Sequence, residues 1–199
     1  MFDRLFCVTP ASGTVVTADQ VKSHLRIDFA DDDSDIGDYI KASEAWFNGP
    51  FGIGVALLPQ TWRLTLDSWA ELQNLRFPMH PVTAVSEITY FDLGGTVQTL
   101  DPSLYLVDLD SYPVRLTRAY GAYWPPIRPQ YGAIKVTFEA GWQDATHVPS
   151  DLVHGIKALA GHYYRNRTPV AGIESRDTPT ELDYMMAGIR ARYSPAMVR

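Results

Sequence analysis

Residues 148–170, VPSDLVHGIKALAGHYYRNRTPV, form the most sharply delimited element of the sequence and predict a long amphipathic helix. Pro149 suits a first helical turn, because the N–H that proline lacks has no partner there. Thr168-Pro169 ends the pattern, because a residue that precedes proline avoids the α conformation. Apolar residues recur between these ends at spacings that share one helix face: Leu152, Ile156, Leu159 and Tyr163.

Two glycines and two histidines lie inside this predicted helix. Gly155 and Gly161 each cost about 1 kcal/mol relative to alanine in a helix interior. They indicate either the close approach of another backbone or a tolerated loss of helix stability, and the sequence leaves both open. His154 and His162 are eight residues apart. Metal-binding helices place histidines three or four residues apart, so we expect surface roles for both.

The hydrophobic period changes from 3.6 to 2 between residues 58 and 142 and then changes back. Trp62, Leu64 and Leu66 begin this region as a half-buried strand, and several short strands with proline between them follow. We therefore predict an α+β fold: a helical bundle from both chain ends with an inserted small antiparallel β-sheet or partial barrel domain. The expected divisions are N-terminal helices at 14–56, the β domain at 57–143, the central helix at 148–170, and a linker with a C-terminal helix at 171–199.

Local signals refine the helical part. Thr17 and Gln20 have the spacing of a capping box at the start of a first helix. Asn48-Gly49-Pro50 stops a second helix, and the glycine-spaced residues 49–56 are interpreted as a linker. No G-x-G-x-x-G pattern occurs there, so we expect no dinucleotide site.

The acidic run FADDDSD invites comparison with a calcium loop. Asp31, Asp33 and Asp35 alternate as calcium ligands do. However, Ile36 takes the place of the required glycine, and Ala42 takes the place of the bidentate glutamate. We expect no calcium, and we expect residues 33–35 to supply a helix cap instead.

Composition and motifs argue against catalysis. The chain of 199 residues carries a net charge of −6, which is unsuited to gripping a phosphate backbone. Cys7, the only cysteine, fits a reducing cytoplasm and lies in an N-terminus that we expect to be mobile. No nucleophile elbow, metal motif or P-loop occurs, and no apolar run is long enough for a membrane span. We therefore predict no enzyme activity, no catalytic or metal site, no cofactor and no membrane partner.

Several segments, in matching order over residues 14–170, resemble one family of tailed-phage proteins. They are LLPQTWRLTLDSW, FPMHPVTAVSEITYFDLGG, YLVDLDSYPVRLTRAYGAYWPP, AIKVTFEAGW and the helix of residues 148–170, preceded by TADQVKSHLRID and DDDSDIGDYIKASEAWF. This ordered set resembles the head–tail connector (adaptor) proteins of phages and gene transfer agents, of the gp6-like and phiE125 gp8-like kind. Residues beyond Gly172 match no segment of that family.

The resemblance implies a structural protein in the neck of a virion or virus-like particle, made in the bacterial cytoplasm. The implied assembly is a ring of about a dozen copies beneath the portal protein, which extends the DNA channel and receives the next neck or tail-completion protein. Double-stranded DNA would pass through without specific binding, because an acidic lumen repels it. The alternatives are another neck protein such as a stopper, or a soluble enzyme or small-molecule-binding domain that uses the YGAYWPP loop.

Two groups of residues are candidates for contacts. The C-terminal helix has an apolar face with an arginine at its end, which we predict to dock on the portal: Leu182, Met185, Met186, Ile189 and Arg190. Its alternative position is folded back on the helices of its own subunit. The aromatic residues Tyr120, Tyr123 and Trp124 are predicted to contact other subunits or the next neck protein. Packing within the subunit's own core is the alternative for them.

Overall fold

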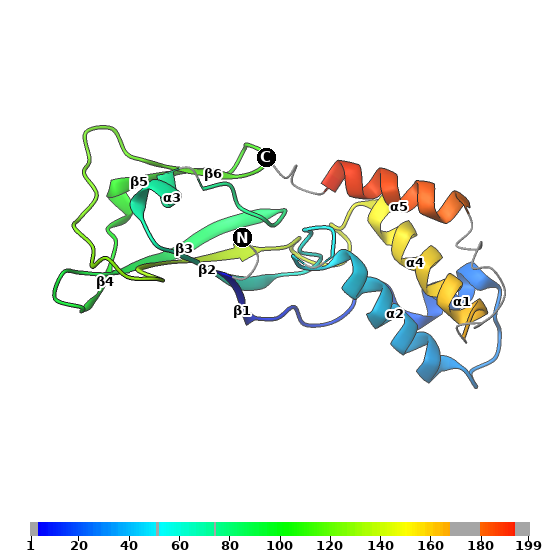
Figure 1. Ribbon diagram of the computed structural model, residues 1–199. Coiled ribbons are helices and arrows are strands. Elements are labelled where there is room, and N and C mark those ends of the chain that lie inside the picture. The colour runs from blue at the N-terminus through cyan, green and yellow to red at the C-terminus, as the bar shows by residue number, and fades with distance from the viewer. Residues whose placement is uncertain (1–3, 51, 74, 168–179, 194–199) are drawn as a thin grey trace. The chain divides into compact units, whose positions relative to one another are not determined.

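The computed structural model describes residues 4–50, 52–73, 75–167 and 180–193, and these residues fall into two compact units (Figure 1). The first unit holds the residues up to Ala11 together with Pro59–Gly141, and the second holds Ser12–Leu58 together with the residues from Trp142 onward. In the described part of the chain, no helix combines the length and the apolar character needed to cross a membrane.

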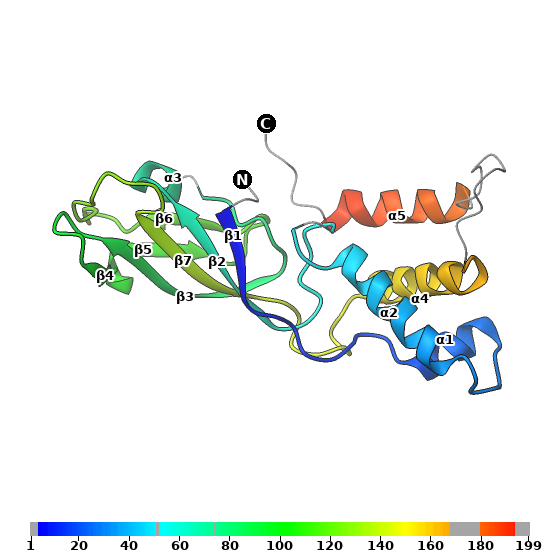
Figure 2. The same ribbon diagram turned by 60° about the horizontal axis from the view of Figure 1, so that its bottom comes forward.

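The first unit is built on an antiparallel five-stranded sheet of order β1-β2-β7-β3-β4 (Figure 2). Its strands are β1 (Leu5–Thr9), β2 (Gln60–Leu66), β7 (Ile134–Ala140), β3 (Val82–Phe91) and β4 (Val97–Thr99). A second, two-stranded sheet pairs β5 (Tyr105–Asp108) with β6 (Arg115–Arg118). Helix α3 (Trp69–Gln73) and the short 3-10 helix Pro102–Leu104 complete the unit. The predicted α+β class with a small antiparallel sheet is thus confirmed.

One face of the five-stranded sheet is the core of this unit. Alternate residues of β2 and β7 are buried, as a period of 2 requires: Gln60, Trp62, Leu64, Leu66, Ile134, Val136, Phe138 and Ala140. Phe77, outside the strands, packs edge-on against Phe138 with ring centroids 4.9 Å apart. Since β1 pairs with β2 and places Cys7 opposite Trp62, the expectation of a mobile N-terminus at Cys7 is wrong.

Among the described residues, the second unit packs three helices around α4 (Ser150–Arg165): α1 (Ala18–Leu25), α2 (Asp33–Phe47) and α5 (Thr180–Tyr193). Helix α4 lies within the predicted range 148–170 but is shorter, because it ends at Arg165 with Asn166 as its C-cap. Thr17 and Gln20 form the predicted capping box, in which each side chain accepts a hydrogen bond from the other residue's backbone N–H. Apolar residues between α4 and the helices packed on it form a second core, which includes Val21, Ile36, Ile40, Phe47, Leu152 and Ile156.

Two local interpretations were wrong. The described residues of 49–56 are not a linker, because Ile53, Val55 and Ala56 are buried in the second unit, and the Gly49 N–H donates to the Val55 carbonyl at 2.7 Å. No side chain caps α2: its N-cap is Asp32, whose carboxylate bonds elsewhere, and Asp33 and Asp35 lie in the first helical turn. In both places, tertiary contacts outweigh the local sequence signal.

Candidate interaction surfaces

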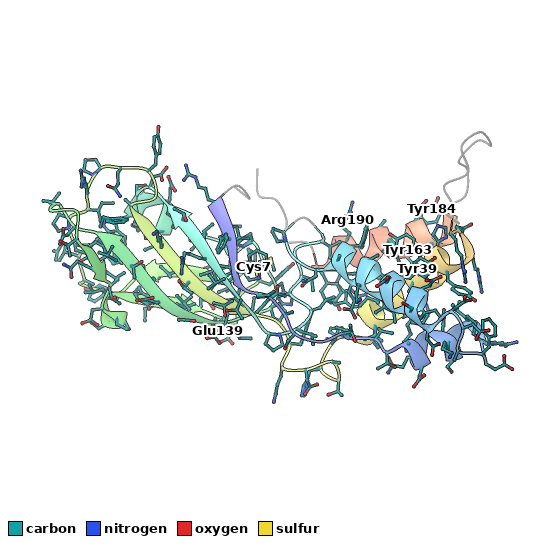
Figure 3. The ribbon with its side chains drawn as sticks, turned by 90° about the horizontal axis from the view of Figure 1, so that it is seen from below. Cys7, Tyr39, Glu139, Tyr163, Tyr184 and Arg190 are labelled. Atoms are coloured by element: carbon teal, nitrogen blue, oxygen red, sulfur yellow. The ribbon has the colours of Figure 1, made fainter. Side chains whose placement is uncertain are left out.

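Helix α5 lies against its own subunit with most of the predicted docking face buried. Leu182, Met186 and Ile189 are 6–8% exposed, and Met185 is half-buried. Arg190 is exposed, and its guanidinium lies over the ring of Trp46 in α2, 5.1 Å from the ring centroid. Figure 3 shows Arg190 and Tyr184 on this helix. The structure therefore shows the folded-back position, and docking on a portal protein stays a prediction.

The end of α5 is anchored to the start of α4. The Arg192 guanidinium donates to Asp151 Oδ2 at 2.7 Å, and the Tyr193 hydroxyl donates to Asp151 Oδ1 at 2.9 Å. Tyr193 also packs edge-on against Trp142, with ring centroids 6.4 Å apart. Burial, followed by the hydrogen bond to Asp151, raises the pKa of the Tyr193 hydroxyl. These contacts fix the helix end by charge and aromatic packing.

The glycines of α4 mark the places where side chains of neighbouring helices come closest. A Cβ atom on Gly155 would lie 2.8 Å from Phe47 Cζ and 2.9 Å from Ile189 Cδ1. A Cβ atom on Gly161 would lie 2.8 Å from Leu25 Cδ2. At both glycines side chains make the close approach, and not another backbone as one alternative had it.

The acidic run is held by a network of hydrogen bonds between α2 and the end of α4. The Tyr164 hydroxyl and the Arg167 guanidinium both donate to Asp32 Oδ2 at 2.6 Å, and together they lower the pKa of the Asp32 carboxyl. Lys22 pairs with Asp33 at 2.7 Å. Of the alternating aspartates, Asp33 and Asp35 thus belong to ion pairs in the first turn of α2, while Asp31 is exposed and precedes the helix. The described residues contain no group of three or more His, Cys, Asp or Glu placed to hold a metal.

The half-buried carboxylate of Glu44 accepts hydrogen bonds from backbone N–H groups of the segment that precedes α1. Glu44 Oε1 of α2 accepts hydrogen bonds from the backbone N–H groups of Val15 at 2.6 Å and Val16 at 3.2 Å. Burial raises the pKa of the Glu44 carboxyl, and these two hydrogen bonds partly offset the rise. The role of Glu44 is not evident from the sequence, because nothing in the local pattern around Glu44 points to Val15.

His24 and His154 are exposed on the second unit, and His162 of the same unit is half-buried. His24 and His154 face each other edge-on at 5.9 Å between ring centroids. His24 and His162 line a pocket of about 330 Å³ between α1, α4 and α5, whose other residues are Leu25, Ala158, Gly161, Arg165, Asn166, Leu182 and Met185. Burial, followed by the charges of His154 and two basic neighbours, lowers the pKa of His24.

The three aromatic candidates lie in the aromatic loop, defined as residues 118–131 of the first unit, but their environments differ. Tyr120 and Tyr123 are 105% and 81% exposed. Trp124 instead stacks on Trp69 of α3, with ring centroids 4.9 Å apart and an interplanar angle of 10°. The Trp124 indole N–H is buried and has no hydrogen-bond partner among the described residues. The two tyrosines are therefore available for contacts, while Trp124 packs within its own unit.

Comparison with solved structures identifies chains of similar fold. A chain of a native gene transfer agent virion matches with a TM-score of 0.75 at 23% identity, over 98% of this chain and 97% of the other. A chain in the neck of an empty gene transfer agent particle, computed with C6 symmetry, matches with a TM-score of 0.72 at 26% identity, over 92% and 93%. A chain in the neck of the native particle, computed with C12 symmetry, matches with a TM-score of 0.67 at 24% identity.

The neck location predicted from the sequence agrees with the location of these structural neighbours. No model of a known protein family matches the sequence, and no curated protein does either. The comparison of folds therefore carries the functional argument.

Proposed function

We propose that this chain is a structural protein of a particle neck, specifically a head–tail connector (adaptor) that forms a ring beneath the portal. The observation that carries the proposal is the fold match over nearly the whole length of both chains, to a chain of a gene transfer agent virion. A match of this extent covers both units of the chain and not one common domain. The ordered motif resemblance over residues 14–170 supports the same assignment independently of the helix at the C-terminus.

The same comparisons support ring formation. The neck reconstructions that contain similar chains have C6 and C12 symmetry, which agrees with a ring of about a dozen copies. Cyclic assemblies join one surface of each copy to a different surface of the next. The net charge of −6 suits a channel wall, because DNA that is repelled passes without being held.

Within this proposal, the helical unit drawn from both chain ends carries the portal contact through α5. Because Leu182, Met186 and Ile189 are buried against their own subunit, docking of this face requires α5 to leave α4. Deletion of residues 175–199 is expected to leave a folded protein that no longer joins portal-bearing capsids. Circular dichroism checks folding, and normal binding of the folded truncated chain to portal would refute the docking role.

The connector role is tested in cells that produce the particles. Removing the gene is expected to leave DNA-filled heads without tails, and supplying the chain from a plasmid restores tailed particles. Electron cryo-microscopy of the restored particles should place the chain in the neck. Tails attached normally in the absence of the chain would rule out the proposal.

The alternatives predict different partners. A stopper binds the adaptor rather than the portal, and an enzyme or small-molecule-binding domain binds neither. Mass measurement of the purified chain with purified portal separates these cases: a ring complex supports the adaptor, whereas no complex in the presence of portal contradicts it.

A further inference from the structure

The aromatic loop carries exposed aromatic rings and positive charge in an otherwise acidic chain. Tyr131, like Tyr120 and Tyr123, is almost fully exposed, at 92%. No Asp or Glu occurs from residue 111 to residue 138. Arg118 and Arg128 are both exposed, and neither forms an ion pair with another described residue. The Arg118 guanidinium lies over the Tyr123 ring, 5.8 Å from its centroid. The loop thus presents three tyrosines and two cations without a carboxylate partner among the described residues.

The loop has a firm support, so a partner would meet a preorganised surface. The Trp69 indole N–H donates to the Pro125 carbonyl at 2.7 Å, and Trp69 stacks on Trp124 beneath the loop. The Arg128 N–H donates to the Phe91 carbonyl at 3.0 Å. Prolines at 125, 126 and 129 further restrict the backbone. Little conformational entropy is therefore lost when the tyrosines are covered.

A surface that complements this loop needs carboxylates beside an apolar group. Residues 28–31, Asp28-Phe29-Ala30-Asp31, are all exposed and provide both features. Phe29 is 46% exposed. Asp28 and Asp31 have no ion pair among the described residues, whereas Asp32, Asp33, Asp35 and Asp38 are paired with Arg167, Lys22 and Lys41.

We propose that the aromatic loop of one copy binds residues 28–31 of a second copy. The inference rests on the proposed ring, in which two different surfaces must meet at every subunit boundary. Arg118 and Arg128 would face Asp28 and Asp31, while Phe29 packs among the tyrosines. Opposite charges on the two surfaces speed association and fix the register, and the covered aromatic rings supply affinity.

Charge exchange tests the pairing. One variant carries Arg118→Asp and Arg128→Asp, a second carries Asp28→Arg and Asp31→Arg, and a third combines all four changes. The first two are expected to reduce incorporation into particles by about tenfold or more, since each leaves like charges opposed. The third is expected to recover incorporation, because the pairs are restored with reversed sign. Quantitative mass spectrometry of purified particles measures incorporation, and circular dichroism confirms that all variants fold.

The outcomes separate this inference from the connector proposal. If wild-type protein enters the neck but the first variant enters equally well, or the combined variant does not recover, the pairing is wrong. Loss of only the next neck protein in the first variant also refutes the pairing and assigns the loop to that partner. If wild-type protein never enters particles, the connector proposal fails. Sedimentation velocity of the purified chain then tests the pairing. The pairing requires that wild-type protein associates as its concentration rises, that each double variant loses this association, and that the combined variant recovers it.

Discussion

Gly155 of α4 lies against the ring of Phe47 in α2 so closely that an added methyl group would be 2.8 Å from Phe47 Cζ. Ile189 of α5 closes the same site from another side, 2.9 Å from the added atom. Phe47 is fully buried, so its ring can shift only by displacing its neighbours in the core. The three helices therefore meet at a position where a larger residue than glycine forces Phe47 or Ile189 to shift.

Gly155→Ala is accordingly expected to destabilise the protein. Overpacking costs about 1–3 kcal/mol, which outweighs the gain of about 1 kcal/mol in helix propensity. Gly37→Ala in α2 is the matched control, because no atom lies within 4 Å of its added Cβ, and it should be stabilising. Urea unfolding of the two variants measures the difference. An alanine at 155 that is as stabilising as one at 37 would disprove the packing argument.

The sequence predicts those elements that are encoded locally. The α4 helix has its start, its end and its apolar face within residues 148–170, and the capping box needs only Thr17 and Gln20. Strand β1 escapes such analysis, because its pairing with β2 joins residues far apart in the chain. The segment after α2 resembles a linker in sequence for a related reason: glycine and proline dominate the local signal, while burial of Ile53 and Val55 depends on the whole unit.

The candidate contacts were predictable to a similar extent. The aromatic character of residues 120–124 indicates an exposed loop, and Tyr120 and Tyr123 are indeed exposed. The stacking of Trp124 on Trp69 could not be foreseen, since it requires α3 and the loop to come together. Likewise, the period of α5 reveals an apolar face but does not say which surface that face covers.

Glu44 provides a prediction about pH. A carboxyl whose pKa is raised in the folded state favours folding when it is protonated. Its contribution is therefore fully present below the unfolded value of 4.5 and is lost as pH rises through the folded value. Glu44→Gln keeps an acceptor for Val15 and Val16 without a charge. Relative to this variant, wild-type protein should gain stability as pH falls toward 4.5. Thermal unfolding across this range checks the sign, and an opposite slope would contradict it.

Glu44→Ala should be worse than Glu44→Gln at every pH. It leaves the N–H groups of Val15 and Val16 without their acceptor, at a cost of about 1–3 kcal/mol for each buried group. Urea unfolding measures the two variants side by side. Equal stability of the alanine and glutamine variants would show that water replaces the carboxylate at no cost.

Asp32 should show the opposite pH dependence. Its pKa is lowered by hydrogen bonds from Tyr164 and Arg167, so its contribution is present above the unfolded value of 3.8 and is lost as pH falls through the folded value. Asp32→Asn is therefore expected to lower the Tm at neutral pH, and the difference from wild-type protein should shrink in acid. Asp31→Asn, at an exposed position without an ion pair among the described residues, is the control. A pH-independent Tm difference would show that the effect is not due to ionisation.

The stacked tryptophans give the last prediction, because the same substitution should have unequal effects at the two positions. Trp69→Phe removes the hydrogen bond to the Pro125 carbonyl, whereas Trp124→Phe removes a buried N–H that has no partner among the described residues. A lost hydrogen bond costs about 1 kcal/mol, and loss of an unsatisfied donor relieves a penalty of similar size. Trp69→Phe should therefore be the more destabilising by about 1 kcal/mol or more in urea unfolding. Equal losses would mean that ring packing alone determines the stability of this pair, and that the orphan N–H is satisfied in solution.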